Sequence, residues 1–332
     1  MRIRFHNYFL IAGFFIPVLF GCHSSDQKTE PPTDATVTEV TSPVAPFNAD
    51  SAFSFVKKQV DFGPRKPNTA AHGQCADYLT GKLKSYTPDV VEQEGSVTAY
   101  DGTILKIRNI IASFNKDQAK RILLFAHWDT RPWADQDTTR TREPILGADD
   151  GGSGVGVLLE LARQFALRQP SVGVDIALFD AEDWGKNGGG AEGLDSYGLG
   201  TQYWTRQPHV PGYTAEYGIL LDMVGAVNAQ FRMEGNSSQV APGLNEKVWR
   251  TAARLGYSNY FLYEQGGYVT DDHVYVIRYG IPCIDIIGSD NVTATGFGRH
   301  WHTHADDLTV IDKKTLQAVG QTLMEIVYGE SN

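Results

Sequence analysis

The apolar residues of this chain form two kinds of pattern, which predict two kinds of element. Short, nearly continuous apolar runs are typical of strands covered on both faces. These runs lie at residues 104–114, 121–125, 172–179, 217–221 and 282–287. Longer stretches carry apolar residues on one face and predict helices, as Val157, Leu158, Leu161 and Phe165 illustrate. These stretches lie at residues 53–60, 72–83, 153–167, 245–255 and 313–328.

Strands that alternate with helices predict a single α/β domain over residues 46–332. Its central sheet is expected to be twisted, mixed but mostly parallel, with flanking helices. Asn48 or Asp50 can cap the first helix, and Gly63-Pro64 can end it. In sheets of this type ligands bind beyond the carboxyl ends of the strands. The residues that follow each predicted strand are therefore the first candidates for a functional site.

The first residues of the chain do not follow this pattern. Arg2 and Arg4 precede a short apolar run that ends in Leu19-Phe20-Gly21-Cys22. A charged start and a short apolar run are typical of a signal peptide, and the ending resembles a bacterial lipobox. We expect residues 1–21 to be a lipoprotein signal peptide and Cys22 to be the lipidated residue. An ordinary signal peptide with a chance cysteine is the alternative.

Residues 22–45 are polar and rich in Pro, Ser and Thr, which predicts a flexible tether. The protein is therefore expected in the cell envelope, anchored by lipid on Cys22. His23 in place of an acidic residue after Cys22 is compatible with the periplasmic face of the outer membrane.

Composition narrows the possible partners. The net charge of −10 and the lack of a Lys/Arg cluster argue against a nucleic-acid partner, because phosphate binding needs clustered cations. Cys75 and Cys283 lie in no CxxC pattern, so cysteine-bound zinc is not expected. The two cysteines could form a disulfide or be buried as small apolar residues.

Acidic and histidine residues follow the predicted strands. His127-Trp128-Asp129 comes after the strand at 121–125, where the Asp can hold the imidazole in one tautomer or orient a metal site. Three acids follow the strand at 172–179: Asp180, Glu182 and Asp183. Acids crowded at the end of a buried strand are costly unless a cation compensates them.

Four further motifs carry similar residues. They are Gly147-Ala148-Asp149-Asp150-Gly151-Gly152-Ser153-Gly154, Asp222-Met223-Val224-Gly225, Thr270-Asp271-Asp272-His273 and the segment from Arg299 to Asp307 with three histidines. Oxygen and imidazole ligands without thiolates suit zinc, and a catalytic zinc keeps one position open. A GxSxG nucleophile elbow is absent from the sequence, which weakens the case for serine chemistry.

In this order the motifs resemble those of the zinc aminopeptidase superfamily M28, and within it the glutaminyl cyclases of bacterial envelopes. The resemblance runs from Phe62-Gly63-Pro64-Arg65 to the last predicted helix. It implies one zinc ion per chain, held by Asp150, Asp183 and His302. Many family members have Glu in place of Asp183, and the shorter side chain must approach the metal more closely.

The same resemblance implies the remaining roles. Glu182 would be the general base, and Asp222 and Asp271 would share a hydrogen-bond network with it. Trp301 and Phe297 match aromatic residues of the cyclase pocket. The activity implied is conversion of an N-terminal glutamine of peptides or proteins to pyroglutamate, with release of ammonia.

Three points stay open from the sequence. Trp184 fits either the pocket or the packed core. In the aminopeptidases of the superfamily, residues matching His127 and Asp222 bind a second zinc, so a two-metal aminopeptidase is the main alternative. A non-catalytic binding lipoprotein is the third reading, which the complete set of acids and histidines disfavours.

Overall fold

The computed structural model describes residues 44–188, 193 and 195–331. The predicted signal peptide, Cys22 and all but the last two residues of the predicted tether lie outside this part of the chain. Among the described residues, none of the helices has the length and apolar character needed to cross a membrane.

The main sheet has six strands, and the predicted site residues lie at the carboxyl ends of its parallel strands. Its order is β1 (Val90–Thr98), β2 (Ile104–Phe114), β4 (Gly173–Phe179), β3 (Arg121–His127), β5 (Tyr217–Asp222) and β8 (Cys283–Ile287). β4, β3, β5 and β8 run parallel to one another, while β1 and β2 add antiparallel pairs at one side. The predicted mixed, mostly parallel sheet is thus confirmed. β6 (Phe231–Met233) and β7 (Phe261–Gln265) form a separate parallel pair.

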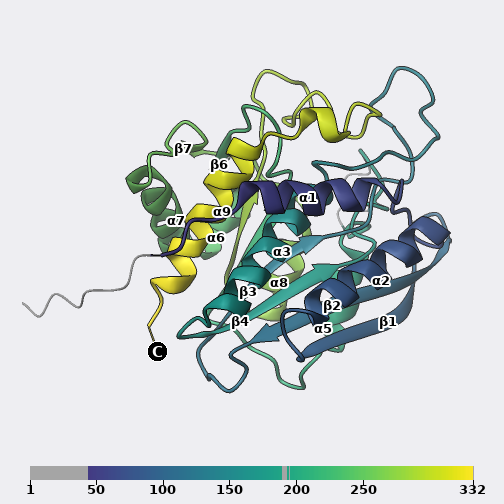
Figure 1. The fold of residues 1–332 in the computed structure, drawn as a ribbon. Helices are drawn as coiled ribbons and strands as arrows, with labels where there is room; N and C mark the ends of the chain where they lie inside the picture. Colours follow the sequence, from purple (N-terminus) through teal and green to yellow (C-terminus); the bar gives the residue numbers. More distant parts are fainter. Residues whose placement is uncertain (1–43, 189–192, 194, 332) are drawn as a thin grey trace, which may run out of the picture. The chain divides into compact units, whose positions relative to one another are not determined.

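Helices cover both faces of this sheet because successive strand residues point to opposite sides. The helices are α1 (Ala49–Val60), α2 (Ala70–Lys84), α3 (Gly152–Leu167), α5 (Leu199–Arg206), α6 (Gly235–Val240), α7 (Pro242–Arg254), α8 (Asp272–Tyr279) and α9 (Lys313–Tyr328). In β3, Ile122, Leu124 and Ala126 belong to the core shared with α1, α2, α3, α7 and α9. Leu123 and Phe125 belong to the opposite core, shared with α5 and α8. Figure 1 is viewed from the side of α1, α2 and α9.

Local signals place several of these elements where the sequence predicts them. The side chain of Asn48 accepts a hydrogen bond from the backbone N–H of Ser51 and caps α1. α7 begins three residues before its predicted start, because Pro242 occupies the first turn, where its missing N–H costs nothing.

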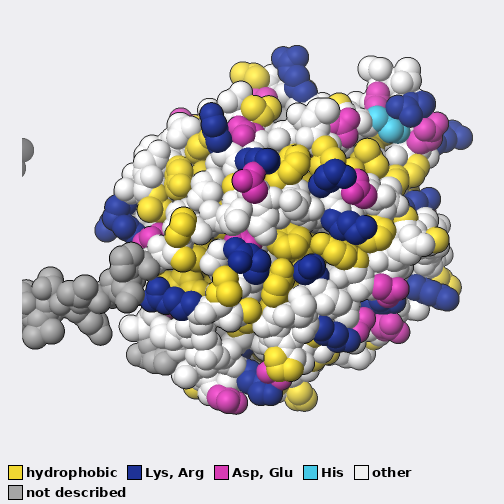
Figure 2. All heavy atoms as spheres, in the orientation of Figure 1, with side chains coloured by type: hydrophobic (Ala, Val, Ile, Leu, Met, Phe, Trp, Pro, Cys, Tyr) yellow, Lys and Arg dark blue, Asp and Glu magenta, His cyan; other side chains and the backbone are white. Residues whose placement is uncertain are grey.

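On the face shown in Figure 2, Lys and Arg side chains are spread singly among apolar and acidic ones.

The two cysteines of the described chain are not paired. Both are free and buried. Cys75 on α2 packs in the core on one side of the sheet, and Cys283 on β8 packs in the core on the other side. The disulfide considered from the sequence is therefore wrong, and both cysteines act as small apolar residues.

Candidate metal site and catalytic residues

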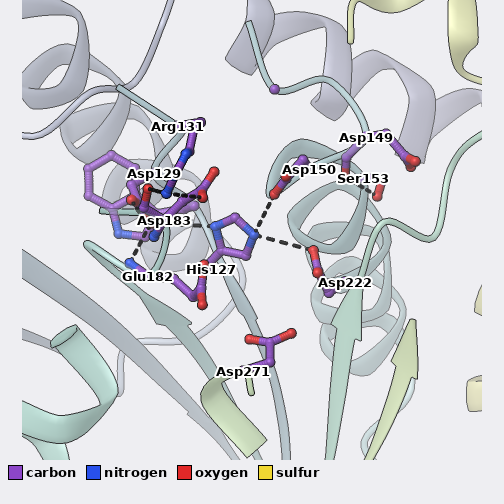
Figure 3. Close-up of polar contacts among 12 residues, drawn as sticks. His127, Asp129, Arg131, Asp149, Asp150, Ser153, Glu182, Asp183, Asp222 and Asp271 are labelled. Atoms are coloured by element: carbon purple, nitrogen blue, oxygen red, sulfur yellow. Dashed lines mark hydrogen bonds and ion pairs between the residues drawn. The ribbon is translucent and has the colours of Figure 1, made fainter. Parts of the chain in front are cut away.

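The carboxyl ends of the parallel strands bring the predicted residues together, as Figure 3 shows. His127 is the last residue of β3, Glu182 and Asp183 follow β4, and Asp222 is the last residue of β5. Asp271 is the N-cap of α8, where it accepts a hydrogen bond from the N–H of Asp272.

The glycine-rich loop before α3 brings Asp150 into this group. Gly151 adopts a φ of 83°, a conformation that favours glycine. A Cβ on Gly151 would lie 2.7 Å from the carbonyl oxygen of Asp129 and 2.9 Å from Cε1 of His127. The loop therefore needs a residue without a side chain in order to lie against the end of β3.

Asp150, Asp183 and His302 form one group of potential metal ligands. One donor atom from each lies within 4.8 Å of the others, and all three residues are buried. Nε2 of His302 lies 3.2 Å from Oδ1 of Asp183 and 3.6 Å from Oδ2 of Asp150. The second oxygen of Asp183 is buried without a hydrogen-bond partner. Two carboxylates, one imidazole and an unpartnered oxygen fit a zinc ion with an open position.

His127, Asp150 and Asp222 form a second such group. Nε2 of His127 lies 3.1 Å from Oδ1 of Asp150 and 3.3 Å from Oδ1 of Asp222. Asp150 therefore presents one oxygen to each histidine. Burial alone would lower the pKa of His127, but the carboxylates of Asp129, Asp150 and Asp222 raise it well above its usual value.

Two buried carboxylates position the acids of the site through the backbone. Asp129 accepts hydrogen bonds from the N–H groups of Glu182 and Asp183, at 2.9 and 3.2 Å. Asp306 does the same for Asp149 and Asp150, at 2.7 and 3.1 Å. The sequence predicts a supporting role for Asp129 through His127 alone, and it gives no role to Asp306.

Arg131 and Asp135 link Asp183 to His302. Nη1 of Arg131 donates to the backbone oxygen of Asp183 at 2.9 Å, and Nη2 donates to Oδ2 of Asp135 at 2.7 Å. Oδ1 of Asp135 lies 3.1 Å from Nδ1 of His302, an ion-pair distance without hydrogen-bond geometry. A carboxylate on the far nitrogen of a histidine is typical of metal sites, where it fixes the ring. Arg131 and Asp135 stand within eight positions of His127, but neither belongs to a motif that predicts this role.

Glu182, Asp222 and Asp271 are the three acids expected to handle protons. Burial raises the pKa of Glu182 well above its usual value, and the charge of Asp271 adds to this effect. Burial also raises the pKa of Asp222 and of Asp271 to about 7. A carboxyl group whose pKa is raised in this way can both accept and return a proton, which suits a general base.

A cavity of about 440 Å³ opens over these residues. Its lining includes all three acids and all three residues of the Asp150 group. Phe297 and Trp301 also line it, with ring centroids 4.8 Å apart, and the Trp301 ring stacks on His302 at 3.8 Å. His127 is buried behind the cavity and is not part of its lining.

Residues 109–327 match the family model described as Peptidase family M28. The chain belongs to peptidase family M28. Among similar solved structures are a Zn-dependent exopeptidase from Parabacteroides distasonis and the Bacteroides thetaiotaomicron glutaminyl cyclase bound to N-acetylhistamine. The first is 53% identical with a TM-score of 0.85, and the second is 51% identical with a TM-score of 0.84. Each comparison covers 87% of this chain and 100% of the other.

A curated relative of this M28 protein is the glutaminyl-peptide cyclotransferase of Bothrops jararaca. It is 26% identical over 245 residues, which cover 66% of this chain and 64% of the relative. The chain thus spans slightly less than two thirds of the length of that relative. The predicted superfamily and fold are confirmed by the family match and by the solved structures.

One predicted pocket residue of the M28 protein lies elsewhere. Trp184 is not among the residues that line the cavity. It is buried in a small apolar cluster that is separate from the two main cores. Its ring centroid lies 5.7 Å from that of Trp133, and its Nε1 donates a hydrogen bond to Asp101 at 3.2 Å. Core packing, the second of the two readings left open, accounts for this residue.

A further buried polar group adjoins the acids. Nε2 of His273 lies 3.1 Å from Oε2 of Glu234, and Nδ1 lies 3.6 Å from Asp285. Asp285 is fully buried, and neither of its side-chain oxygens has a hydrogen-bond partner. Burial raises its pKa well above the usual value, and the charge of Asp271 contributes. Glu234 and Asp285 stand in no motif, so the sequence does not predict their place beside the acids.

Proposed function

We propose that this M28 protein is a glutaminyl-peptide cyclotransferase. Its substrate is a peptide or protein with an N-terminal glutamine, and its products are the pyroglutamyl peptide and ammonia. The observation that carries the proposal is the position of Glu182. This buried acid lines the same cavity as the Asp150, Asp183 and His302 group and the rings of Phe297 and Trp301. The cyclase from Bacteroides thetaiotaomicron and the Bothrops jararaca enzyme are similar proteins with this activity in their names.

One zinc ion per chain is part of the proposal, with Asp150, Asp183 and His302 as its ligands. A buried Asp183 oxygen without a partner and a donor set without thiolates support this choice. When bound, zinc would supply Lewis-acid polarisation of the γ-carboxamide carbonyl. The shorter side chain of Asp183 does not keep it from the group, because its Oδ1 lies 3.2 Å from Nε2 of His302.

Glu182 moves the proton in this reaction. The substrate's α-amine nitrogen bonds to the γ-carboxamide carbon, and Glu182 takes a proton from that amine. Glu182 then gives the proton to the amide nitrogen, which leaves as ammonia when its bond to carbon breaks. A raised pKa suits a group that must both accept and return a proton. The charge of Asp271 contributes to that raised pKa, and Asp222 lines the same cavity.

The rings of Phe297 and Trp301 contribute to the reaction rate by proximity. A glutamine side chain is flexible, and only a folded conformer brings its amide carbon near its own amine. Phe297 and Trp301 border the space beside His302, where such a conformer would lie. Holding that conformer lowers the activation barrier, because the conformational entropy is lost on binding and not in the ring-closing step.

A zinc aminopeptidase is the second candidate, and one observation favours it. Asp150 presents its two oxygens to two histidines, and His127 with Asp222 completes a second group of potential ligands. With two ions, Glu182 would activate a water molecule and the first peptide bond would be hydrolysed. The Parabacteroides distasonis structure is named as an exopeptidase.

The products of a single substrate separate the two candidates. The peptide Gln-Ala-Ala should yield ammonia and an intact pyroglutamyl tripeptide, as measured by a coupled ammonia assay and mass spectrometry. A chelator should abolish this release, and added zinc should restore it. Free glutamine and Ala-Ala without ammonia would support the aminopeptidase instead.

We also propose that the protein is a lipoprotein of the cell envelope, anchored through Cys22. Support comes from the sequence Leu19-Phe20-Gly21-Cys22 and the short apolar run before it. Metabolic labelling with a fatty acid should mark the wild-type chain and should fail with Cys22→Ser. Recovery of the unmutated protein in the outer-membrane fraction would support the proposed membrane, and its protection from protease in intact cells would support the periplasmic face. An unlabelled wild-type chain would contradict the anchor.

A further inference from the structure

A single loop forms one wall of the cavity and ends in an exposed aromatic ring. Residues 266–271 all line the cavity. Asp271, at the inner end, is 3% exposed, whereas Tyr268 is 67% exposed. The loop therefore runs from the acids of the site outward to the rim, and Tyr268 stands at the rim.

This loop is held firmly by its neighbours. Its backbone makes hydrogen bonds at both sides of Tyr268: the N–H of Gly266 donates to Met233 at 2.8 Å, and the N–H of Val269 donates to Glu234 at 3.0 Å. The N–H of Gly235 also donates to the backbone oxygen of Gly267 at 2.8 Å. A loop tied in this way presents Tyr268 in one position.

The ring itself is also fixed, although most of it is exposed. A Cβ on Gly235 would lie 2.6 Å from Cδ1 of Tyr268, so one part of the ring rests on the α6 backbone. The hydroxyl of Tyr268 accepts a hydrogen bond from Nε2 of Gln239 at 2.6 Å. An exposed aromatic side chain with its hydroxyl engaged has an apolar face to offer and little rotamer entropy to lose on binding.

We infer that Tyr268 binds the second or third residue of the peptide substrate and favours an aromatic or apolar side chain there. This inference rests on the proposed function. Three residues of extended chain span at most about 10 Å, so the Cα atom of Tyr268 lies within about that distance of the Cα atom of Asp271. An extended substrate advances about 3.3 Å per residue, which places the ring within reach of the residues that follow the N-terminal glutamine.

The charged groups of this wall do not compete for the same role. Arg232 lines the cavity but is paired with Glu264 at 2.8 Å. Glu234 also lines it, and it is occupied by His273 and by backbone N–H groups. Arg232 and Glu234 are thus already paired, and the ring face of Tyr268 is an apolar surface that this wall presents at the rim.

The test compares Gln-Phe-Ala and Gln-Ala-Phe with Gln-Ala-Ala in wild type and three variants. The measured quantity is the kcat/KM value of the better of the two Phe peptides divided by that of Gln-Ala-Ala. Tyr268→Ala should lower this ratio about two- to tenfold, the range expected when an aromatic pair is lost. Tyr268→Phe keeps the ring and should keep the ratio. Tyr263→Ala removes a tyrosine that is 55% exposed on β7 but does not line the cavity, and it should also keep the ratio.

Three results would overturn the inference. An unchanged ratio in Tyr268→Ala would show that the ring does not contact the following residues. An equal fall in Tyr263→Ala would show that the effect does not arise in the cavity. No ammonia release by the wild type from any of these peptides would refute the proposed function and this inference with it, whereas the first two results refute the inference alone.

Discussion

Replacing Asp135 by alanine should weaken zinc binding without removing any proposed ligand. The carboxylate lies 3.1 Å from Nδ1 of His302 and accepts a hydrogen bond from Nη2 of Arg131 at 2.7 Å. Without it, the imidazole is free to turn or to take the wrong tautomer. Loss of such a supporting carboxylate typically weakens metal binding about 10–100-fold. That factor corresponds to about 1.4–2.8 kcal/mol of binding free energy.

The assay is competition for zinc between the protein and a chromophoric chelator. Asp137→Ala is the matched control, because Asp137 lies 2.8 Å from Nδ1 of His304, a second Asp–His pair in the same two segments. His304 belongs to none of the ligand groups found among the described residues. The reasoning is refuted if Asp135→Ala binds zinc as tightly as wild type, or if Asp137→Ala weakens binding equally.

Three further perturbations test other parts of the site. Glu182→Gln should keep zinc bound but lower ammonia release at least about 100-fold, the usual contribution of a general base; near-normal release would remove Glu182 from that role. Burial raises the pKa of Asp222 and Asp271 to about 7, above the unfolded value of about 3.9. The folded metal-free protein thus holds protons that the unfolded chain has lost, so its Tm should fall as the pH rises from about 4 to 7. Asp271→Asn should flatten this slope, and a slope equal to that of wild type would contradict the assignment. Asp306→Ala leaves the buried backbone N–H groups of Asp149 and Asp150 unpaired, so the free energy of unfolding should fall by roughly 2–6 kcal/mol in urea denaturation; a change below about 1 kcal/mol would argue against this role of Asp306.

The sequence predicts the fold well where burial is two-sided. β3, β4, β5 and β8 appear as apolar runs because both faces are covered, and the long helices appear through their apolar stripes. β1 was missed because it is an edge strand with most residues at least partly exposed, so its sequence VVEQEGSVT carries little apolar pattern. α5, α6 and α8 were missed because six to eight residues give too few turns for a periodic signal.

The sequence predicts some residues of the site and not others. Residues in motifs after strands could be found, because strand ends meet at one edge of the sheet. The role of Asp306 could not, since its side chain binds the backbone N–H groups of Asp149 and Asp150, and a contact to backbone leaves no residue pattern in the sequence. Trp184 shows the opposite limit: it follows Asp183 directly, yet its side chain packs against Trp133 while Asp183 faces His302.

The proposed cyclase reaction depends most on one zinc ion held beside Glu182. Anomalous scattering at the zinc edge, from crystals of the full-length protein grown with zinc, tests this directly. One peak per chain, contacted by Asp150, Asp183 and His302, is the predicted result. Two peaks bridged by Asp150, with the second contacted by His127 and Asp222, would contradict the account and favour the aminopeptidase.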